Sequence, residues 1–349
     1  MEEQVIPAEQ TADTTADLEA EALAAAPQKR RINRAVLSEN LWGWFFVCFL
    51  VIGTTLFIYL AFVLSVWLSF VDYRGNGTLW EALGEGNSSG AFYWYQYMFS
   101  NTMPGYFGSV APGGIANFGT TLLNTIFYLI GIPVGMALSL FFAALMSRDI
   151  KGSGVFRVIY YIPTVASTVS VALLWENLFG GSTTGGTGGT MVQLFGTNFI
   201  TGDRWMKMLT VLILTTWKGL GGSILLLCAG MNGVNESHKE AASIDGANAW
   251  TTFWRISLPQ LWPTIFYCIV TSFIGGMQIF AEPDLLYGNG VSDASVMEVT
   301  PFVGLIYGNY YTNTTRYYSY CSALGIVLMI IILLLTLVQF WLDSRRDKV

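Results

Sequence analysis

The sequence predicts an all-α membrane protein with six transmembrane helices. Hydrophobic residues make up 53% of the 349 residues and charged residues only 11%, whereas a soluble domain carries about 25% charged residues. Six apolar segments have about the 20 residues that a helix needs to cross the hydrocarbon core. They lie at about 42–70, 118–146, 156–178, 208–231, 261–280 and 321–342. An even number of spans places both ends of the chain on one side of the membrane.

The N-terminal segment differs from the rest of the chain. Residues 1 to about 28 are rich in Ala, Glu and Thr and contain no aromatic residue. Such a segment buries too little apolar surface to offset its ordering entropy, so residues 1–40 are predicted to form a disordered, basic cytoplasmic tail. The apolar run of the first transmembrane helix, at 41–72, is much longer than that of a signal peptide, which argues against a cleaved signal.

The basic residues assign the two sides of the membrane. Twelve lie on one side of the predicted spans and four on the other, and Lys218 falls within a span. The positive-inside rule therefore predicts that both termini, including a short tail at 343–349, are cytoplasmic. The twelve are Lys29, Arg30, Arg31, Arg34, Arg148, Lys151, Arg157, Lys239, Arg255, Arg345, Arg346 and Lys348.

The predicted external segments are long and rich in Gly, Asn, Tyr and Trp. They lie at 71–117 (an extracellular loop at 73–117), 179–207 and 281–320. This composition suits contact with a soluble partner, but aromatic residues near span ends also form the usual interfacial belt. The Gly-rich run at 180–189 lacks the Gly-Lys-Ser/Thr ending of a phosphate-binding loop and is interpreted as a flexible linker.

Metal and disulfide chemistry are not indicated. The four cysteines, Cys48, Cys228, Cys268 and Cys321, all lie in or beside apolar runs, and the one histidine is His238. No pair of these residues has the spacing of a metal site, so the cysteines are expected to be small apolar residues of helices. No nucleophile, base or metal cluster of a membrane-embedded enzyme is visible either.

One charged stretch, from Glu240 to Pro259, lies between the fourth and fifth spans. Glu240-Ala241-Ala242 should begin a short helix, and Gly246 permits a tight turn with positive φ. Pro259 should restrict Leu258 to extended geometry, so that the chain bends just before the next span. The stretch should thus form a helix, a turn and a second helix across the cytoplasmic face.

The same stretch resembles the EAA loop of ABC-importer permeases. That loop reads Glu-Ala-Ala, three residues, Gly, nine residues, Ile, one residue, Leu-Pro, and every spacing is present here, with Asp245 as in the sugar-importer version. An amphipathic helix at the membrane surface is the alternative, but it would not require these positions together. The motif residues to which the resemblance assigns ATPase coupling are Glu240, Ala241, Ala242, Asp245, Gly246, Ile256, Leu258 and Pro259.

The resemblance extends more weakly over residues 115–342. It implies the MetI-like, type I ABC importer permease fold: a five-helix core at 118–342 with a coupling loop at 232–260. It also implies import of a sugar or oligosaccharide across the cell membrane by ATP-driven alternating access. The alternatives are an ABC importer for a polyol or glycerophosphodiester, and a secondary transporter, which would not explain the EAA spacing.

The partners follow from the same resemblance. They are a second, non-identical permease, two ATPase subunits and an extracellular solute-binding protein, all acting at the lipid bilayer, with no nucleic acid. ATP and Mg²⁺ would be bound by the ATPase, so this chain would be a transport subunit that binds no cofactor and is not itself an enzyme.

Polar groups within the spans are candidates for the substrate pathway. Lys218 lies about ten residues into the fourth span, beside Trp217 and several glycines, and buried ionisable residues usually face an interior or a cavity. A structural ion pair with Glu176, or a bond to a backbone carbonyl, is favoured slightly over a pathway role, and snorkelling is a further alternative. Glu176 itself is expected at the membrane interface.

The fifth span adds further candidates. Ser272 and Gly276 are four residues apart and share one helical face, and Gln278 follows them. In maltose-type permeases the helices beside the EAA loop contact sugar, so the resemblance makes Ser272, Gly276, Gln278, Trp217 and Lys218 the candidate pathway residues. Helix packing explains Ser272 equally well. The segment IFAEPDLLYGNG at 279–290 resembles the FDxxxxLTxGGP segment of sugar permeases, with departures at Tyr287 and Asn289-Gly290.

Overall fold

The computed structural model describes most of the membrane-embedded chain. The described residues are 34–73, 78, 80–81, 84, 90–99, 118–146, 153–180, 189–196, 199–200, 202–287, 299–311 and 317–346. All regular elements in these ranges are helices, as expected for an all-α protein. Residues 1–33 of the predicted tail at 1–40, most of the loop at 73–117 and the Gly-rich run within 181–188 lie outside the described residues. The rest of the predicted tail differs from the prediction, because a helix begins at Arg34. The chain divides into two units, Met1–Phe62 and Val63–Val349.

The described residues of the first unit form one long helix. It comprises α2 (Arg34–Thr54) and a π-helical turn, η1 (Thr55–Leu60), and continues into α3 (Ala61–Leu68). No residue from Gly43 to Phe62 is buried, and Phe49 and Phe57 are each more than 80% exposed within the chain (83% and 82%). A helix that is apolar on all sides and buries none of them suits a lipid environment.

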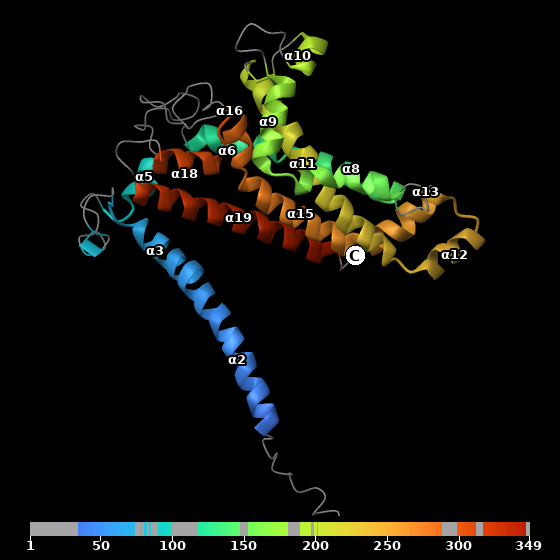
Figure 1. Ribbon diagram of the computed structural model, residues 1–349, viewed down its shortest axis with the longest axis horizontal. Helices are drawn as coiled ribbons and strands as arrows, with labels where there is room; N and C mark the ends of the chain where they lie inside the picture. The colour runs from blue at the N-terminus through green and yellow to red at the C-terminus, as the bar shows by residue number, and fades with distance from the viewer. Residues whose placement is uncertain are drawn as a thin grey trace, which may run out of the picture. The chain divides into compact units, whose positions relative to one another are not determined.

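The second unit holds the remaining helices, with α11 at its centre. The long helix α11 packs against α6, α7, α8, α15 and α16, and α19 packs against α5, α15 and α18. Figure 1 shows α12 and α13 at one end of this unit and α5 and α18 towards the other. The helices are α5 (Tyr93–Phe99), α6 (Phe118–Tyr128), α7 (Gly131–Met146), α8 (Ser153–Val165), α9 (Thr168–Phe179), α10 (Thr190–Phe195), α11 (Arg204–Asn232), α12 (Glu236–Ile244), α13 (Ala249–Thr252), η3 (Phe253–Ser257), α14 (Leu258–Gln260), α15 (Trp262–Met277), α16 (Ala281–Tyr287), α18 (Phe302–Tyr311) and α19 (Tyr318–Arg346).

The membrane-spanning segments include two bent pairs. Among the described residues, four helices are long and apolar enough to cross a membrane: Gly43–Leu68, Phe118–Met146, Arg204–Asn232 and Tyr318–Arg346. Two further candidates are helix pairs, Gly154–Val165 with Thr168–Phe179 and Trp250–Gln260 with Trp262–Met277. Counting each pair as one span gives the six spans of the sequence prediction.

The third span is not the single helix that was predicted for 156–178. The axes of α8 and α9 meet at 100°, and Ser167, at the start of α9, has an extended backbone with ψ of 135°. An extended residue ends the run of helical hydrogen bonds, so the chain changes direction there. Both halves are apolar, which is why hydropathy alone predicts an unbroken span.

Aromatic residues from the predicted external side pack into the protein. Trp94 of α5 is 2% exposed, and its indole Nε1 donates a hydrogen bond to the carbonyl of Val71 at 2.8 Å. Tyr93 and Tyr97 stack on each other, and Tyr97 and Trp94 contact Tyr320 of α19. These described aromatics therefore stabilise the helix bundle.

Alanine substitutions at two neighbouring glycines of α11 are expected to change the stability of the protein in opposite directions. A Cβ on Gly221 would lie 2.6 Å from the Tyr160 carbonyl and would also clash with Thr164, whereas a Cβ on Gly219 would meet nothing within 4 Å. Gly221→Ala should destabilise the protein by about 1–3 kcal/mol through overpacking. Gly219→Ala should stabilise it by up to about 1 kcal/mol through its better helix propensity. Thermal unfolding of the two purified variants checks this, and equal midpoints would contradict the close packing of α8 on α11.

Candidate functional site

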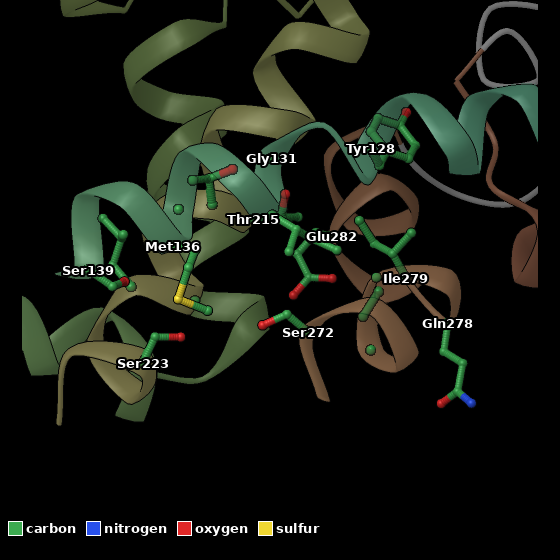
Figure 2. Close-up of a pocket in the computed structure, with 18 of the residues that line it drawn as sticks. Tyr128, Gly131, Met136, Ser139, Thr215, Ser223, Ser272, Gln278, Ile279 and Glu282 are labelled. Atoms are coloured by element: carbon green, nitrogen blue, oxygen red, sulfur yellow. The ribbon is translucent and has the colours of Figure 1, made fainter. Parts of the chain in front are cut away.

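A cavity of about 530 Å³ lies between the helices of the second unit. Its walls come from α7, α11 and α15 and from the chain that joins α15 to α16 (Figure 2). Glycines on these helices leave room for it, since they place no side chain in the space. The lining residues used below are Gly131, Gly135, Ser139, Thr215, Gly219, Ser223, Ser272, Gly275, Gly276, Gln278 and Glu282.

The polar lining is made mainly of hydroxyl groups. Ser139, Ser223 and Ser272 contribute one each from α7, α11 and α15, and Thr215 adds another. The Ser139 hydroxyl is fully buried and has no hydrogen-bond partner among the described residues. A buried hydroxyl without a partner costs about 1–3 kcal/mol, and because Ser139 is 0% exposed, a solute could reach it only after a movement of the surrounding helices. Sequence reasoning missed Ser139 and Ser223, although a lone serine in an apolar span is a weak signal for such positions.

Three of the five predicted pathway residues line the cavity. Ser272, Gly276 and Gln278 do so, whereas Trp217 and Lys218 are not lining residues. Figure 2 shows Gln278 extending away from the other labelled side chains, and it is exposed, so it lies at the rim. Trp217 packs against Trp175 with ring centroids 5.8 Å apart.

Gly276 serves the packing of the cavity wall. A Cβ at this position would lie 2.8 Å from Leu129 Cδ2 and 3.2 Å from Ile132 Cδ1. Because the absence of a side chain lets α15 approach the chain at the α6–α7 junction, Gly276 shapes the cavity and offers no functional group to a solute.

Lys218 forms an ion pair, but with Glu282 and not with Glu176. Its Nζ lies 3.0 Å from Glu282 Oε1, and both side chains are 18% exposed. The predicted partner Glu176 is exposed near the end of α9. It is the first turn of α9 that reaches Lys218, since the ammonium also donates to the Thr168 hydroxyl. Glu176 lies eight residues further along that helix, about 12 Å at helical rise.

The Lys218 position joins both halves of the broken span. The Thr164 hydroxyl, near the end of α8, donates to the Lys218 carbonyl at 2.9 Å. With the bond to Thr168 at the start of α9, one residue of α11 holds the chain on both sides of the 100° bend. Through Glu282 it also holds the start of α16. In that same short helix, burial raises the pKa of the Asp284 carboxyl above its ordinary value.

The predicted coupling loop has the helix–turn–helix form expected from the sequence, but its first helix begins at Glu236 and not at Glu240. The Asn235 side chain caps α12 by accepting from the Ser237 amide at 3.1 Å. After α12, Gly246 has a φ of +79°, which glycine adopts without steric cost. The Ala247 amide then donates to the Ala242 carbonyl at 2.9 Å, which closes the turn.

The end of this loop differs from the prediction. Leu258 has helical angles (φ −62°, ψ −44°) and not extended ones, and the chain continues as a helix through Gln260. A π-helical turn over Phe253–Ser257 immediately precedes the proline, and such a wide turn relieves the clash between a proline ring and the helix before it. The bend of 67° comes later, between Gln260 and Trp262.

The motif residues divide between two faces. Glu240, Ala241, Asp245, Gly246 and Pro259 are exposed, whereas Ala242 is buried and Ile256 is half-buried. Leu258 packs against the buried cluster that contains Leu261. The two most exposed large apolar side chains of the loop are Ile244 (87%) and Trp250 (70%). The loop thus has an inner face that attaches it to the bundle and an outer face that is free in this chain.

The end of α19 fixes the start of α15. Trp262, the first residue after the bend, donates from Nε1 to Asp343 Oδ1 at 2.6 Å. The Arg346 guanidinium lies 3.7 Å from the centre of the Trp262 indole, within the range of a cation–π interaction. The last turns of the chain therefore hold the pivot between the loop and the cavity-lining helix.

Known proteins resemble this chain over most of its length. A probable ABC transporter permease protein, YesP of Bacillus subtilis, is 28% identical over 89% of this chain and 93% of its own. The lactose transport system permease protein LacF of Rhizobium radiobacter is 26% identical over 87% and 94%. The arabinooligosaccharides transport system permease protein AraP of Bacillus subtilis is 30% identical over 65% and 72%.

A solved structure has the same fold. It is a chain of a bacterial alginate ABC transporter in complex with an alginate pentasaccharide-bound periplasmic protein. The TM-score is 0.70 at 18% identity, with 91% of this chain and 99% of that chain covered. The model of the family described as binding-protein-dependent transport system inner membrane component matches residues 131–348. Since this match spans more than half of the chain, the protein belongs to the family of inner membrane components of binding-protein-dependent transport systems.

Proposed function

We propose that this chain is one of two permease subunits of an ABC importer that carries a sugar or oligosaccharide into the cell. Its partners would be a second, non-identical permease, an extracellular solute-binding protein and two ATPase subunits that bind ATP and Mg²⁺. Related permeases named for lactose and for arabinooligosaccharides support the class of solute. The hydroxyl-rich lining of the cavity suits it as well, because hydroxyl groups can donate to and accept from those of a sugar.

One observation carries this proposal: the two helices that flank the coupling loop both line the cavity. The helix α11 contributes Thr215, Gly219 and Ser223 and then runs to Asn232, four residues before α12 begins. The helix α15 begins directly after the loop and reaches the cavity with Ser272 and Gly275. Its 16 residues make a rod of about 24 Å. A displacement of the loop would therefore move two walls of the cavity.

The exposed side of the loop is the surface we assign to the ATPase. Glu240, Asp245, Ile244 and Trp250 are all exposed there, and a mixed apolar and acidic knob of this kind suits a groove with basic residues at its edge. In the proposed cycle, ATP closes the ATPase dimer and moves the loop. The bend at Leu261, held by the contact of Trp262 with Asp343, then transmits the motion to α15.

Uptake by the assembled importer tests the proposal. The chain is co-purified with its partner subunits and reconstituted into vesicles with the binding protein outside and ATP inside. Maltotriose, arabinotriose and lactose serve as labelled probes. We expect uptake of at least one probe that stops when ATP is replaced by a non-hydrolysable analogue. Uptake that continues without ATP and follows a proton or sodium gradient would identify a secondary transporter instead.

The proposed orientation predicts which residues are reached from each side of the cell membrane. Both termini and the coupling loop should be cytoplasmic, so a cysteine at Thr190 should react with an impermeant thiol reagent from outside, and one at Ser237 should not. Both side chains are exposed. The measurement is labelling of intact cells in a background without the four native cysteines, with opened cells as the control for Ser237→Cys. External labelling of Ser237→Cys would reverse the assigned topology.

A further inference from the structure

One acidic side chain lines the cavity wall in the described part of the chain. Among the described lining residues, Glu282 is the only Asp, Glu, Lys, Arg or His. Figure 2 shows its carboxylate on the side of the cavity where Ser272 lies. The other polar lining groups are neutral hydroxyls, the Gln278 amide and the Tyr128 phenol. The net charge that a solute meets in the cavity therefore depends on which group neutralises Glu282.

Lys218 neutralises Glu282 by an ion pair. The ammonium contacts Oε1 of the carboxylate at 3.0 Å but is not itself a lining residue. Its second bond goes to the Thr168 hydroxyl of α9. Of the two charged groups only the carboxylate belongs to a lining residue, and the positive charge is already engaged in a charge-assisted hydrogen bond.

Neighbouring cations are also directed elsewhere. The Arg204 guanidinium donates to Asn124 Oδ1 at 2.8 Å, and neither Arg204 nor Lys207 lines the cavity. Arg157 is an exposed residue of α8 and does not line it either. No lysine or arginine of the described part of the chain therefore lines the cavity.

From this arrangement we infer that the Glu282–Lys218 pair makes the cavity selective for uncharged, hydroxyl-rich solutes and against anionic ones such as uronides or phosphorylated polyols. The inference rests on the proposed function and names its substrate class. A sugar hydroxyl can donate to the Glu282 carboxylate and exchange hydrogen bonds with Ser223 and Ser272, which are partly exposed. A carboxylate or phosphate would lose its water without gaining a counter-charge, which is strongly unfavourable.

The pair predicts a gain of function when it is broken. In Glu282→Gln the carboxylate is replaced by an amide of similar shape, so the Lys218 ammonium is left as an unpaired positive charge beside the cavity. Anionic solutes should then be favoured. In the double variant Glu282→Gln, Lys218→Met both charges are absent. The preference for uncharged over anionic solutes should therefore return to near that of the natural protein.

Charged thiol reagents measure this property directly, without knowledge of the solute. Ser272→Cys is introduced into the complete importer, with the native cysteines replaced. The rates of modification by the anionic methanethiosulfonate ethylsulfonate and the cationic methanethiosulfonate ethyltrimethylammonium are compared, each relative to its rate with 2-mercaptoethanol. Ionisation of the thiol itself cancels in the ratio of the two reagents.

With the natural Glu282–Lys218 pair, Ser272→Cys should be modified faster by the cationic reagent, or equally fast by both reagents. Glu282→Gln should shift the ratio towards the anionic reagent by about tenfold, since one negative charge close to the probe is lost. Lys218→Met should shift it in the opposite direction, which keeps the test decisive if Glu282→Gln does not fold. A preference for the anionic reagent with the natural pair, or a ratio that neither variant changes, would overturn the inference.

A transport measurement separates this inference from the proposed function. Reconstituted importer is offered a neutral oligosaccharide that it carries, with trigalacturonate as competitor, and the same is done for Glu282→Gln. We expect trigalacturonate to compete only in the variant; equal competition in the natural protein would contradict the charge selection. If none of the neutral probes is carried while the reagent ratios shift as expected, the solute class of the proposed function is wrong and the neutral character of the cavity stands.

Discussion

Replacing Gly246 with leucine is expected to abolish solute-stimulated ATP hydrolysis and uptake together. The φ of +79° at this turn is a conformation that costs a residue with a Cβ of order 1–3 kcal/mol. A Cβ here would meet nothing within 4 Å in this chain, so the leucine side chain would project from the exposed face that we assign to the ATPase. Added volume at a closely packed contact strains it, and we expect both activities to fall more than about tenfold, as for the loss of a central interface residue.

Two further substitutions separate backbone strain from added volume. Asparagine tolerates positive φ far better than leucine does, so Gly246→Asn should retain much more activity than Gly246→Leu. Gly246→Ala adds little volume but keeps the strain, and should lie between them. Glu240→Lys, on the same exposed face, should weaken docking without strain because it reverses a surface charge.

The measurements are co-purification of the ATPase and its hydrolysis rate in reconstituted vesicles, with and without binding protein and solute. Membrane insertion should be normal in every variant, because the apolar spans are unchanged. Natural coupling in Gly246→Leu would show that this loop does not transmit the motion of the ATPase.

The features that the sequence predicted well are those that depend on neighbouring residues. The turn at Gly246 involves groups at most five residues apart, so the local sequence determines it. The long apolar helices were likewise predictable, because their length and composition are properties of a single segment. The EAA spacing could be read for the same reason.

The features that were missed depend on groups far apart in the chain. Lys218 and Glu282 are 64 residues apart, and Glu282 becomes the partner only because α16 packs against α11 and α9. Nothing in the sequence around Glu176 distinguishes it from Glu282 as a partner. Ser139 is similar, since its burial beside the cavity depends on helices from three parts of the chain.

The bends were mispredicted for a different reason. The break at Ser167 lies within apolar sequence on both sides, and the helical angles of Leu258 depend on a π-helical turn that precedes Pro259. A proline restricts the backbone dihedral angles around it, but it does not determine which residues of the chain change conformation to accommodate it. The position of the segment relative to the neighbouring helices determines where the chain bends.

Filling the cavity from α15 should block transport while leaving the coupling loop intact. Ser272 is half-buried and lines the cavity together with Gly275 and Ser139. In Ser272→Phe the larger ring would occupy space that the solute needs, so uptake should fall more than about tenfold, as expected when a solute is excluded by volume and its hydrogen-bonding partner is lost. ATP hydrolysis and co-purification of the ATPase should persist, because Ser272 lies ten residues after the start of α15, about 15 Å along the helix from the loop.

The matched control is the preceding residue. Thr271 lies on the same helix but is exposed and does not line the cavity, and its hydroxyl donates to the Tyr267 carbonyl at 2.8 Å. Thr271→Phe should therefore keep most of the uptake of the natural protein, whereas Ser272→Phe should lose it. Ser272→Ala tests the hydroxyl alone and should reduce uptake only a few-fold, by about 1 kcal/mol for one hydrogen bond. The measurement is initial uptake by vesicles with equal amounts of assembled importer. Full uptake by Ser272→Phe would make Ser272 a packing residue of α15 and would place the solute path elsewhere in the membrane domain.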